Sequence, residues 1–290
     1  MLYLFKQILR AALWIFCAEI NIKNKTLLNQ KGPLLIIANH PNSFLDAVII
    51  GSSYNRRIHF LARGDVFTKR HHRFLLGLLN MIPVYRIREG KEFLHLNAYA
   101  FEKSVALLKK GESVLIFIEG TCVNKNELQP FKKGTARILE TAQSMGVNPI
   151  IHLAGLYYNN FRGIGKRVNL CLEEFKNPPN IVCSKDRVDF NSLVFTALEK
   201  LIIPITRPPI YNKNLFYYIH LKYYKTIEKK VSKATHGTVF FDSVFFSALL
   251  FTYPLFLLLI FGLLTLLKIP QPIIFITLLC IPIFGKRTIA

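Results

Sequence analysis

The chain has 290 residues, of which 51% are hydrophobic and 19% are charged. Disordered chains combine low hydrophobicity with high net charge, so this composition excludes disorder. The 38 Lys and Arg residues outnumber the 17 Asp and Glu residues, which gives a formal net charge of +21. Such a surplus attracts either nucleic acid or anionic lipid headgroups.

The cysteines exclude a disulfide scaffold, because five in this length are few, odd in number and widely spaced. None forms a CxxC pair or has a histidine at zinc-ligand spacing. We interpret them as reduced thiols of a cytosol-facing protein; they are Cys17, Cys122, Cys171, Cys183 and Cys280.

The N-terminal segment Leu2–Ile20 is apolar but interrupted by Lys6, Arg10 and Glu19. Its uninterrupted stretch, Ala11–Ala18, is too short to cross a bilayer. Residues 1–30 are therefore predicted to form an amphipathic helix at the membrane interface, with the cations reaching toward headgroups. A surface helix packed on the following domain is the alternative.

Residues 31–205 alternate between short apolar runs and segments with helical spacing. The predicted strands are Leu34–Ala38, Arg57–Leu61, Ile82–Tyr85, Val114–Ile118, Ile150–Ala154 and Val168–Leu172. The predicted helices are Leu45–Ser52, Lys69–Leu79, Phe93–Lys110 and Lys132–Met145. This alternation predicts an α/β domain with a mixed, largely parallel sheet flanked by helices.

The C-terminal part changes character at Pro204–Pro209. Residues 206–240 are predicted to be a basic juxtamembrane segment that suits an anionic cytoplasmic leaflet. Residues 241–290 are predicted to form a transmembrane hairpin, because Val244–Leu267 is uncharged and long enough to span. Basic residues on both sides place its two ends in the cytoplasm. A single span followed by a re-entrant piece is the alternative to the hairpin. The chain contains no recognisable nucleic-acid-binding module, so the basic surplus is not expected to bind nucleic acid.

The most informative stretch is Ala38–Asp46, which reads ANHPNSFLD. A predicted strand ends at Ala38, and ligands bind outside the carboxyl ends of strands in α/β sheets. His40 at that edge could remove a proton from a substrate hydroxyl, while Asp46 orients the imidazole and stabilises its cation. A structural His–Asp pair would have the same spacing.

These residues resemble the NHx4D block of the glycerolipid acyltransferases, the PlsC or lysophosphatidic-acid acyltransferase group. Four further segments resemble family blocks in the family's order: Arg63–Phe67 (RGDVF), Met81–Arg86 (MIPVYR), Phe117–Thr121 (FIEGT) and Val147–Ile150 (VNPI). Ordered blocks over residues 34–172 are more specific than any one of them alone.

The resemblance implies a membrane-bound enzyme that transfers an acyl chain from a thioester, acyl-CoA or acyl carrier protein, to a glycerolipid hydroxyl. The implied acceptor is 1-acylglycerol-3-phosphate, in phospholipid biosynthesis, and no cofactor is expected beyond the thioester co-substrate. His40 would be the general base and Asp46 its partner, and Arg86 would bind phosphate. The other implied acceptor-site residues are Asn39, Glu119, Gly120 and Thr121.

One position departs from the family pattern. An arginine usually follows the threonine of the third block, and here that residue is Cys122. Compensating cations are available at Arg88, Lys132 and Lys133. Alternatively, the acceptor has no phosphate, as in a lyso-aminolipid.

Three other interpretations stay open. A glycerol-3-phosphate acyltransferase would share every motif. A catalytically silent lipid-binding homologue is the non-enzyme alternative, although it need not retain both His40 and Asp46. A metal site at His71 and His72 is not expected, because adjacent residues point to different faces of a helix.

Overall fold

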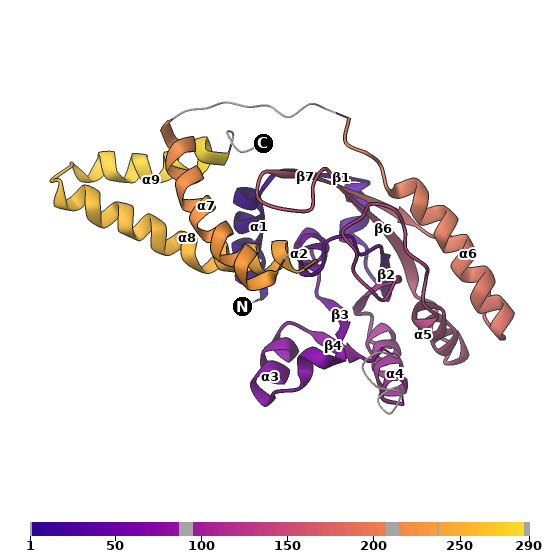
Figure 1. The fold of residues 1–290 in the computed structure, drawn as a ribbon. Helices are drawn as coiled ribbons and strands as arrows, with labels where there is room; N and C mark the ends of the chain where they lie inside the picture. Colours follow the sequence, from indigo (N-terminus) through magenta and orange to yellow (C-terminus); the bar gives the residue numbers. More distant parts are fainter. Residues whose placement is uncertain (1, 87–94, 207–214, 237, 287–290) are drawn as a thin grey trace.

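The computed structural model describes residues 2–86, 95–206, 215–236 and 238–286 (Figure 1). Its centre is a seven-stranded sheet in the order β1-β7-β6-β2-β5-β3-β4. The strands are β1 Cys17–Lys23, β2 Leu34–Ala38, β3 Ile58–Arg63, β4 Met81–Val84, β5 Ser113–Phe117, β6 Ile150–Tyr158 and β7 Lys166–Glu174. Strands β6, β2, β5, β3 and β4 are parallel, and the β6–β7 pairing is antiparallel. The predicted mixed, largely parallel α/β sheet is confirmed.

Helices cover both faces of this sheet (Figure 1). They are α1 Leu2–Phe16, α2 Phe44–Ser53, α3 Arg70–Leu78, α4 Leu96–Lys109, α5 Gly134–Ser144, α6 Ser184–Leu201, α7 Leu215–Thr235, α8 Phe241–Leu266 and α9 Gln271–Lys286. Two short 3-10 turns complete the chain path: Lys25–Asn29 lies between β1 and β2, and Gly64–Phe67 lies between β3 and α3.

The central strand β2 shows how the core is divided. Leu34, Ile36 and Ala38 pack into one apolar cluster with α1, α2 and α8, whereas Leu35 and Ile37 pack into the other with α4, α5 and α6. Side chains alternate across a strand, so both faces of β2 are covered and all five residues are buried. This double burial fixes the strand end that leads to His40.

The N-terminal segment differs from the prediction. Helix α1 ends at Phe16, and the chain continues directly into β1, which pairs in parallel with β7. The segment 1–30 is therefore partly built into the sheet and is not one interfacial helix.

The cations of α1 also do not reach toward headgroups. The Nζ of Lys6 donates to the carbonyls of Tyr54 and Arg56, and Arg10 donates to the carbonyl of Ser52. Carbonyls at a helix C-terminus lack intrahelical partners and carry partial negative charge, so they attract these cations. Burial, with the charge of Arg10 adding to it, lowers the pKa of Lys6 to about 8. The alternative of a helix packed on the domain is the one observed.

The C-terminal helices are only partly separate from the α/β domain. Helix α8 is long and apolar enough to cross a membrane, and no other helix in the described ranges meets both conditions. Its first half is buried in the core, through Phe241, Phe245, Phe246 and Leu249. Its second half is exposed and projects with α9 away from the sheet (Figure 1). The predicted segment 206–240 is mostly helix α7, which packs along α8; part of the predicted boundary at Pro204–Pro209 lies outside the described residues.

Candidate active site

The site lies at the carboxyl edge of the parallel strands. Strand β2 ends at Ala38, two residues before His40, and the neighbouring strand β5 ends at Phe117, two residues before Glu119. Parallel neighbours end at the same edge, so the first and third sequence blocks meet here. The imidazole of His40 stacks on the Phe117 ring, with 3.8 Å between ring centroids and an interplanar angle of 11°.

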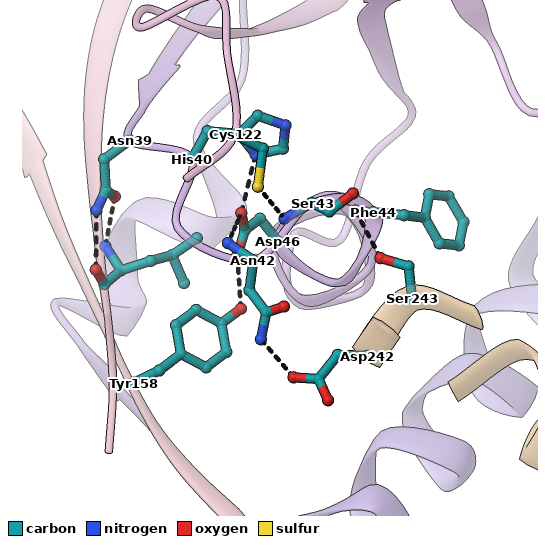
Figure 2. Close-up of polar contacts among 11 residues, drawn as sticks. Asn39, His40, Asn42, Ser43, Phe44, Asp46, Cys122, Tyr158, Asp242 and Ser243 are labelled. Atoms are coloured by element: carbon teal, nitrogen blue, oxygen red, sulfur yellow. Dashed lines mark hydrogen bonds and ion pairs between the residues drawn. The ribbon is translucent and has the colours of Figure 1, made fainter. Parts of the chain in front are cut away.

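His40 and Asp46 form the predicted pair. The Nδ1 atom of His40 lies 2.8 Å from Oδ2 of Asp46 (Figure 2). The Asp46 side chain is fully buried, whereas 19% of the His40 side chain is exposed. An ionised carboxylate accepts only, so Nδ1 carries the proton and Nε2 presents its lone pair. This geometry suits a general base that is oriented and charge-stabilised by a carboxylate.

Two further residues, Asn42 and Tyr158, donate hydrogen bonds to Asp46, and no sequence motif indicated this role for either of them. The backbone N–H of Asn42 donates to Oδ2 at 2.7 Å, and the Tyr158 hydroxyl donates to Oδ1 at 2.6 Å. Burial, with the negative charge of Asp46 adding to it, raises the pKa of Tyr158 well above its usual range, so the hydroxyl remains a donor. Three donors, one of them the His40 ring, therefore fix the position of this buried carboxylate.

Asn39 has a different role from the predicted one. Its side-chain amide donates to the Leu156 carbonyl at 2.9 Å and accepts the Leu156 N–H at 2.8 Å. The residue is buried, and these two bonds attach the β2–α2 loop (residues 39–43) to strand β6. Its predicted contact with the acceptor is not supported, because both ends of the amide are occupied by backbone groups.

Glu119 lies beside His40 and is also buried. Its carboxylate accepts the backbone N–H groups of His40 and Gln129, while burial raises its pKa to about 7. Glu119 therefore holds the His40 backbone. Gly120 follows with a φ of +63°, a left-handed conformation that favours glycine, and Thr121 is half-buried beside it.

Cys122 is turned toward the start of α2. Its Sγ accepts the backbone N–H of Ser43 at 2.9 Å, and burial raises the pKa of the thiol to about 12. The residue in the family's arginine position is therefore a neutral acceptor. It supplies neither a cation nor a thiolate nucleophile.

Of the two arginines predicted to bind phosphate, Arg86 and Arg88, the structure describes only the first. Arg86 follows β4, and its guanidinium lies 3.9 Å from the Asp65 carboxylate, which Arg63 also contacts. Two arginines thus gather around one carboxylate at the carboxyl ends of β3 and β4. Arg88 lies outside the described residues.

The two lysines downstream of the third block, Lys132 and Lys133, have different surroundings. The Lys132 side chain packs against Gly120, where an added Cβ would lie 2.8 Å from Lys132 Cγ. Lys133 is exposed and immediately precedes α5. Across the described part of the chain, His, Cys, Asp and Glu residues form no group of three that could hold a metal ion.

The chain is similar to several known proteins. Residues 19–152 match the family described as Acyltransferase. A chloroplastic 1-acyl-sn-glycerol-3-phosphate acyltransferase of Brassica napus is 27% identical over 117 residues, which cover 39% of this chain and 31% of that protein. The crystal structure of PlsC, the 1-acyl-sn-glycerophosphate acyltransferase of Thermotoga maritima, is similar with a TM-score of 0.49 and 18% identity, over 71% of this chain and 81% of that chain. The match to the Brassica relative spans less than a third of that relative's length. The matched region contains His40, Asp46 and Glu119, so these residues of the site lie within the part of the chain that is similar to the Acyltransferase family.

Proposed function

We propose that the protein transfers an acyl chain from a thioester donor, acyl-CoA or acyl carrier protein, to the hydroxyl of 1-acylglycerol-3-phosphate. The observation that carries the proposal is the His40–Asp46 pair at the sheet edge of an acyltransferase-family domain. The Brassica relative bears the name of this activity, which adds support. Phospholipid biosynthesis is the corresponding pathway.

The chemistry follows from the two ring nitrogens of His40. Nδ1 is held by Asp46, so Nε2 takes the proton of the acceptor hydroxyl as its oxygen attacks the thioester carbonyl carbon. The new C–O bond forms, the C–S bond breaks, and the imidazolium returns its proton to the leaving thiolate. Asp46 stabilises the transient imidazolium throughout. No covalent acyl-enzyme is needed, because the acceptor supplies the nucleophile.

The acceptor phosphate would bind at Arg86 and Arg63. Arg63 is the last residue of β3 and Arg86 follows the neighbouring parallel strand β4, at the edge where His40 lies, and they share Asp65 as a partner. Guanidinium groups match phosphate bidentately, and a dianionic phosphate can compete with a single carboxylate for them. Lys133 and Lys132 are additional cations near Gly120.

The protein would act on a membrane with its α/β domain on the cytoplasmic face. The second half of α8, residues 254–266, is partly or fully exposed and extends for about 20 Å at 1.5 Å per residue. Lys268 at the following turn can reach the far headgroups with its side chain. Five exposed lysines of α7 would face the near leaflet, each contributing about 1 kcal/mol; they are Lys222, Lys225, Lys229, Lys230 and Lys233. We propose a hairpin of α8 and α9 with both ends on the cytoplasmic side.

The test is an acyl-transfer assay with the purified full chain in liposomes. One acyl-CoA is offered with glycerol-3-phosphate, lysophosphatidic acid, a lysophospholipid or a lyso-aminolipid. Product with lysophosphatidic acid is expected, and R63Q and R86Q should raise its KM. Absence of product with every acceptor and with acyl carrier protein as donor would contradict the proposal.

A phosphate-free acceptor is the second candidate, and Cys122 is the observation that favours it. The thiol is neutral and engaged by the Ser43 amide, so the family's usual arginine position offers an anion no charge. Turnover restricted to the lyso-aminolipid, unaffected by R86Q, would establish this candidate. The His40–Asp46 chemistry would be unchanged.

A further inference from the structure

The first turn of α8 contacts the β2–α2 loop that carries His40. Asp242 is fully buried there and forms an ion pair with Lys166 of β7, which is buried as well. The Asp242 carboxylate also accepts the Asn42 side-chain amide at 2.8 Å and the Gly163 N–H at 3.0 Å. A buried carboxylate with three partners is held rigidly, and it holds its partners in turn.

Asn42 connects Asp242 to the catalytic pair. Its backbone N–H donates to Asp46, and its side-chain Nδ2 donates to Asp242 (Figure 2). One residue of the loop therefore bridges the carboxylate that orients His40 and the carboxylate at the start of α8. A shift of Asp242 would move the donor that fixes Asp46.

Ser243 makes a second connection, at the first turn of α2. The N-cap residue Ser43 makes no side-chain capping bond. Instead, the hydroxyl of Ser243 accepts the Phe44 N–H at 3.0 Å. The end of α2 that carries Asp46 is thus capped by a residue 199 positions after Phe44 in the chain, in place of its own N-cap side chain.

The loop geometry shows why external support is needed. Ser43 has a φ of +53° and a ψ of −135°, a combination that side-chain-bearing residues rarely adopt. Such a conformation persists only where surrounding contacts determine it. The contacts on either side of Ser43 come from Asp242, Ser243 and Cys122.

We propose that Asp242 and Ser243 are positioning residues for the His40–Asp46 pair, so that the apolar C-terminal helix completes the active site. The inference rests on the proposed acyl transfer. It means that residues 19–152, the part that matches the family, do not hold the β2–α2 loop by themselves. The catalytic geometry would therefore assemble only when α8 packs on the α/β domain.

The first test compares S243A with S247A in the full chain. The Ser247 hydroxyl donates to the Ser243 carbonyl of its own helix, so S247A removes a hydroxyl from the same helix and leaves the bond to the start of α2 in place. We expect S243A to lower kcat by about tenfold, since small displacements of catalytic groups have effects of this size or more. KM for donor and acceptor should stay unchanged, S243T should restore kcat, and S247A should match the wild type.

A second variant addresses the ion pair. Replacing Asp242 alone would leave Lys166 as an unpaired buried cation, so D242L is combined with K166M. Apolar replacement of both members of a buried pair is often tolerated. We expect the double variant to fold, with a lower kcat and an unchanged KM.

A readout independent of catalysis is the alkylation rate of Cys122, measured by mass spectrometry. Loosening of the loop in S243A should speed labelling of Cys122, while the buried Cys171 of β7 serves as the internal reference. An active wild type with S243A equal to S247A in kcat and in Cys122 labelling would overturn the inference. A wild type inactive on every acceptor, combined with faster Cys122 labelling in S243A, would contradict the proposed function and leave the loop support in place.

Discussion

Tyr158 offers a direct test of how the buried carboxylate is built. In Y158F, Asp46 loses the donor that lies 2.6 Å from its Oδ1 and retains the Asn42 N–H and His40. Both side chains are fully buried, so water cannot replace the hydroxyl. A hydrogen bond to a charged group contributes about 1.5–3 kcal/mol, and we expect Y158F to lower the free energy of unfolding by about 2 kcal/mol at pH 7.

The same substitution should also alter catalysis in a defined direction. A carboxylate with fewer donors holds the protonated imidazole more strongly, so the acidic limb of the kcat/KM profile should move to higher pH. The assays are urea unfolding in detergent and kcat/KM between pH 5 and 9. Y157F is the control, because neighbouring residues of β6 point to opposite faces. Equal stability of Y158F and Y157F, with superimposable pH profiles, would refute this account of Asp46.

Three further predictions concern other parts of the site and its support. Burial raises the pKa of Glu119 from 4.5 to about 7, so the native state retains a proton that the unfolded chain releases between these values, and native stability falls as the pH rises through that window. At about 1.4 kcal/mol per unit of pKa difference, the free energy of unfolding should fall by about 3 kcal/mol across this window. E119Q should remove the fall, as measured by urea unfolding at pH 4.5 and pH 8. G120A and G146A each place an alanine at a positive φ, which costs about 1–2 kcal/mol. G120A should be the more destabilising of the two, because its new Cβ would meet the Lys132 side chain, whereas the Cβ at residue 146 meets no atom within 4 Å. Thermal unfolding compares the two variants. K6M should lower the free energy of unfolding by about 1–2 kcal/mol, by removing two bonds to backbone carbonyls near the end of α2, and unchanged urea unfolding would contradict this docking of α1.

Local sequence signals were sufficient for six of the seven strands and for the position of the His40–Asp46 pair. Leu34–Ala38 was predicted with the observed bounds, because a strand buried on both faces is a continuous apolar run. His40 and Asp46 were identified because they are six residues apart and follow a strand end.

The remaining features depend on contacts between distant segments. Tyr158, Asp242 and Ser243 lie 112 to 200 residues from the groups they hold, and no short motif connects them. Strand β1 was not predicted, because it continues directly from helix α1 without a turn signal in the sequence. Its pairing partner, β7, lies about 150 residues later in the chain. Asp242 is one of two charged residues in 241–285, and its buried ion pair with Lys166 of β7 accounts for a carboxylate in this apolar segment.

The central claim is that His40 is the general base of acyl transfer, and one measurement tests it most directly. The wild type, H40A and H40Q are compared in liposomes for transfer from acyl-CoA to lysophosphatidic acid, with thermal unfolding recorded for each. Our account predicts that both variants unfold near the wild-type temperature and lose transfer by at least about a hundredfold, the range of general-base catalysis. Near-wild-type turnover in a folded H40A would contradict it.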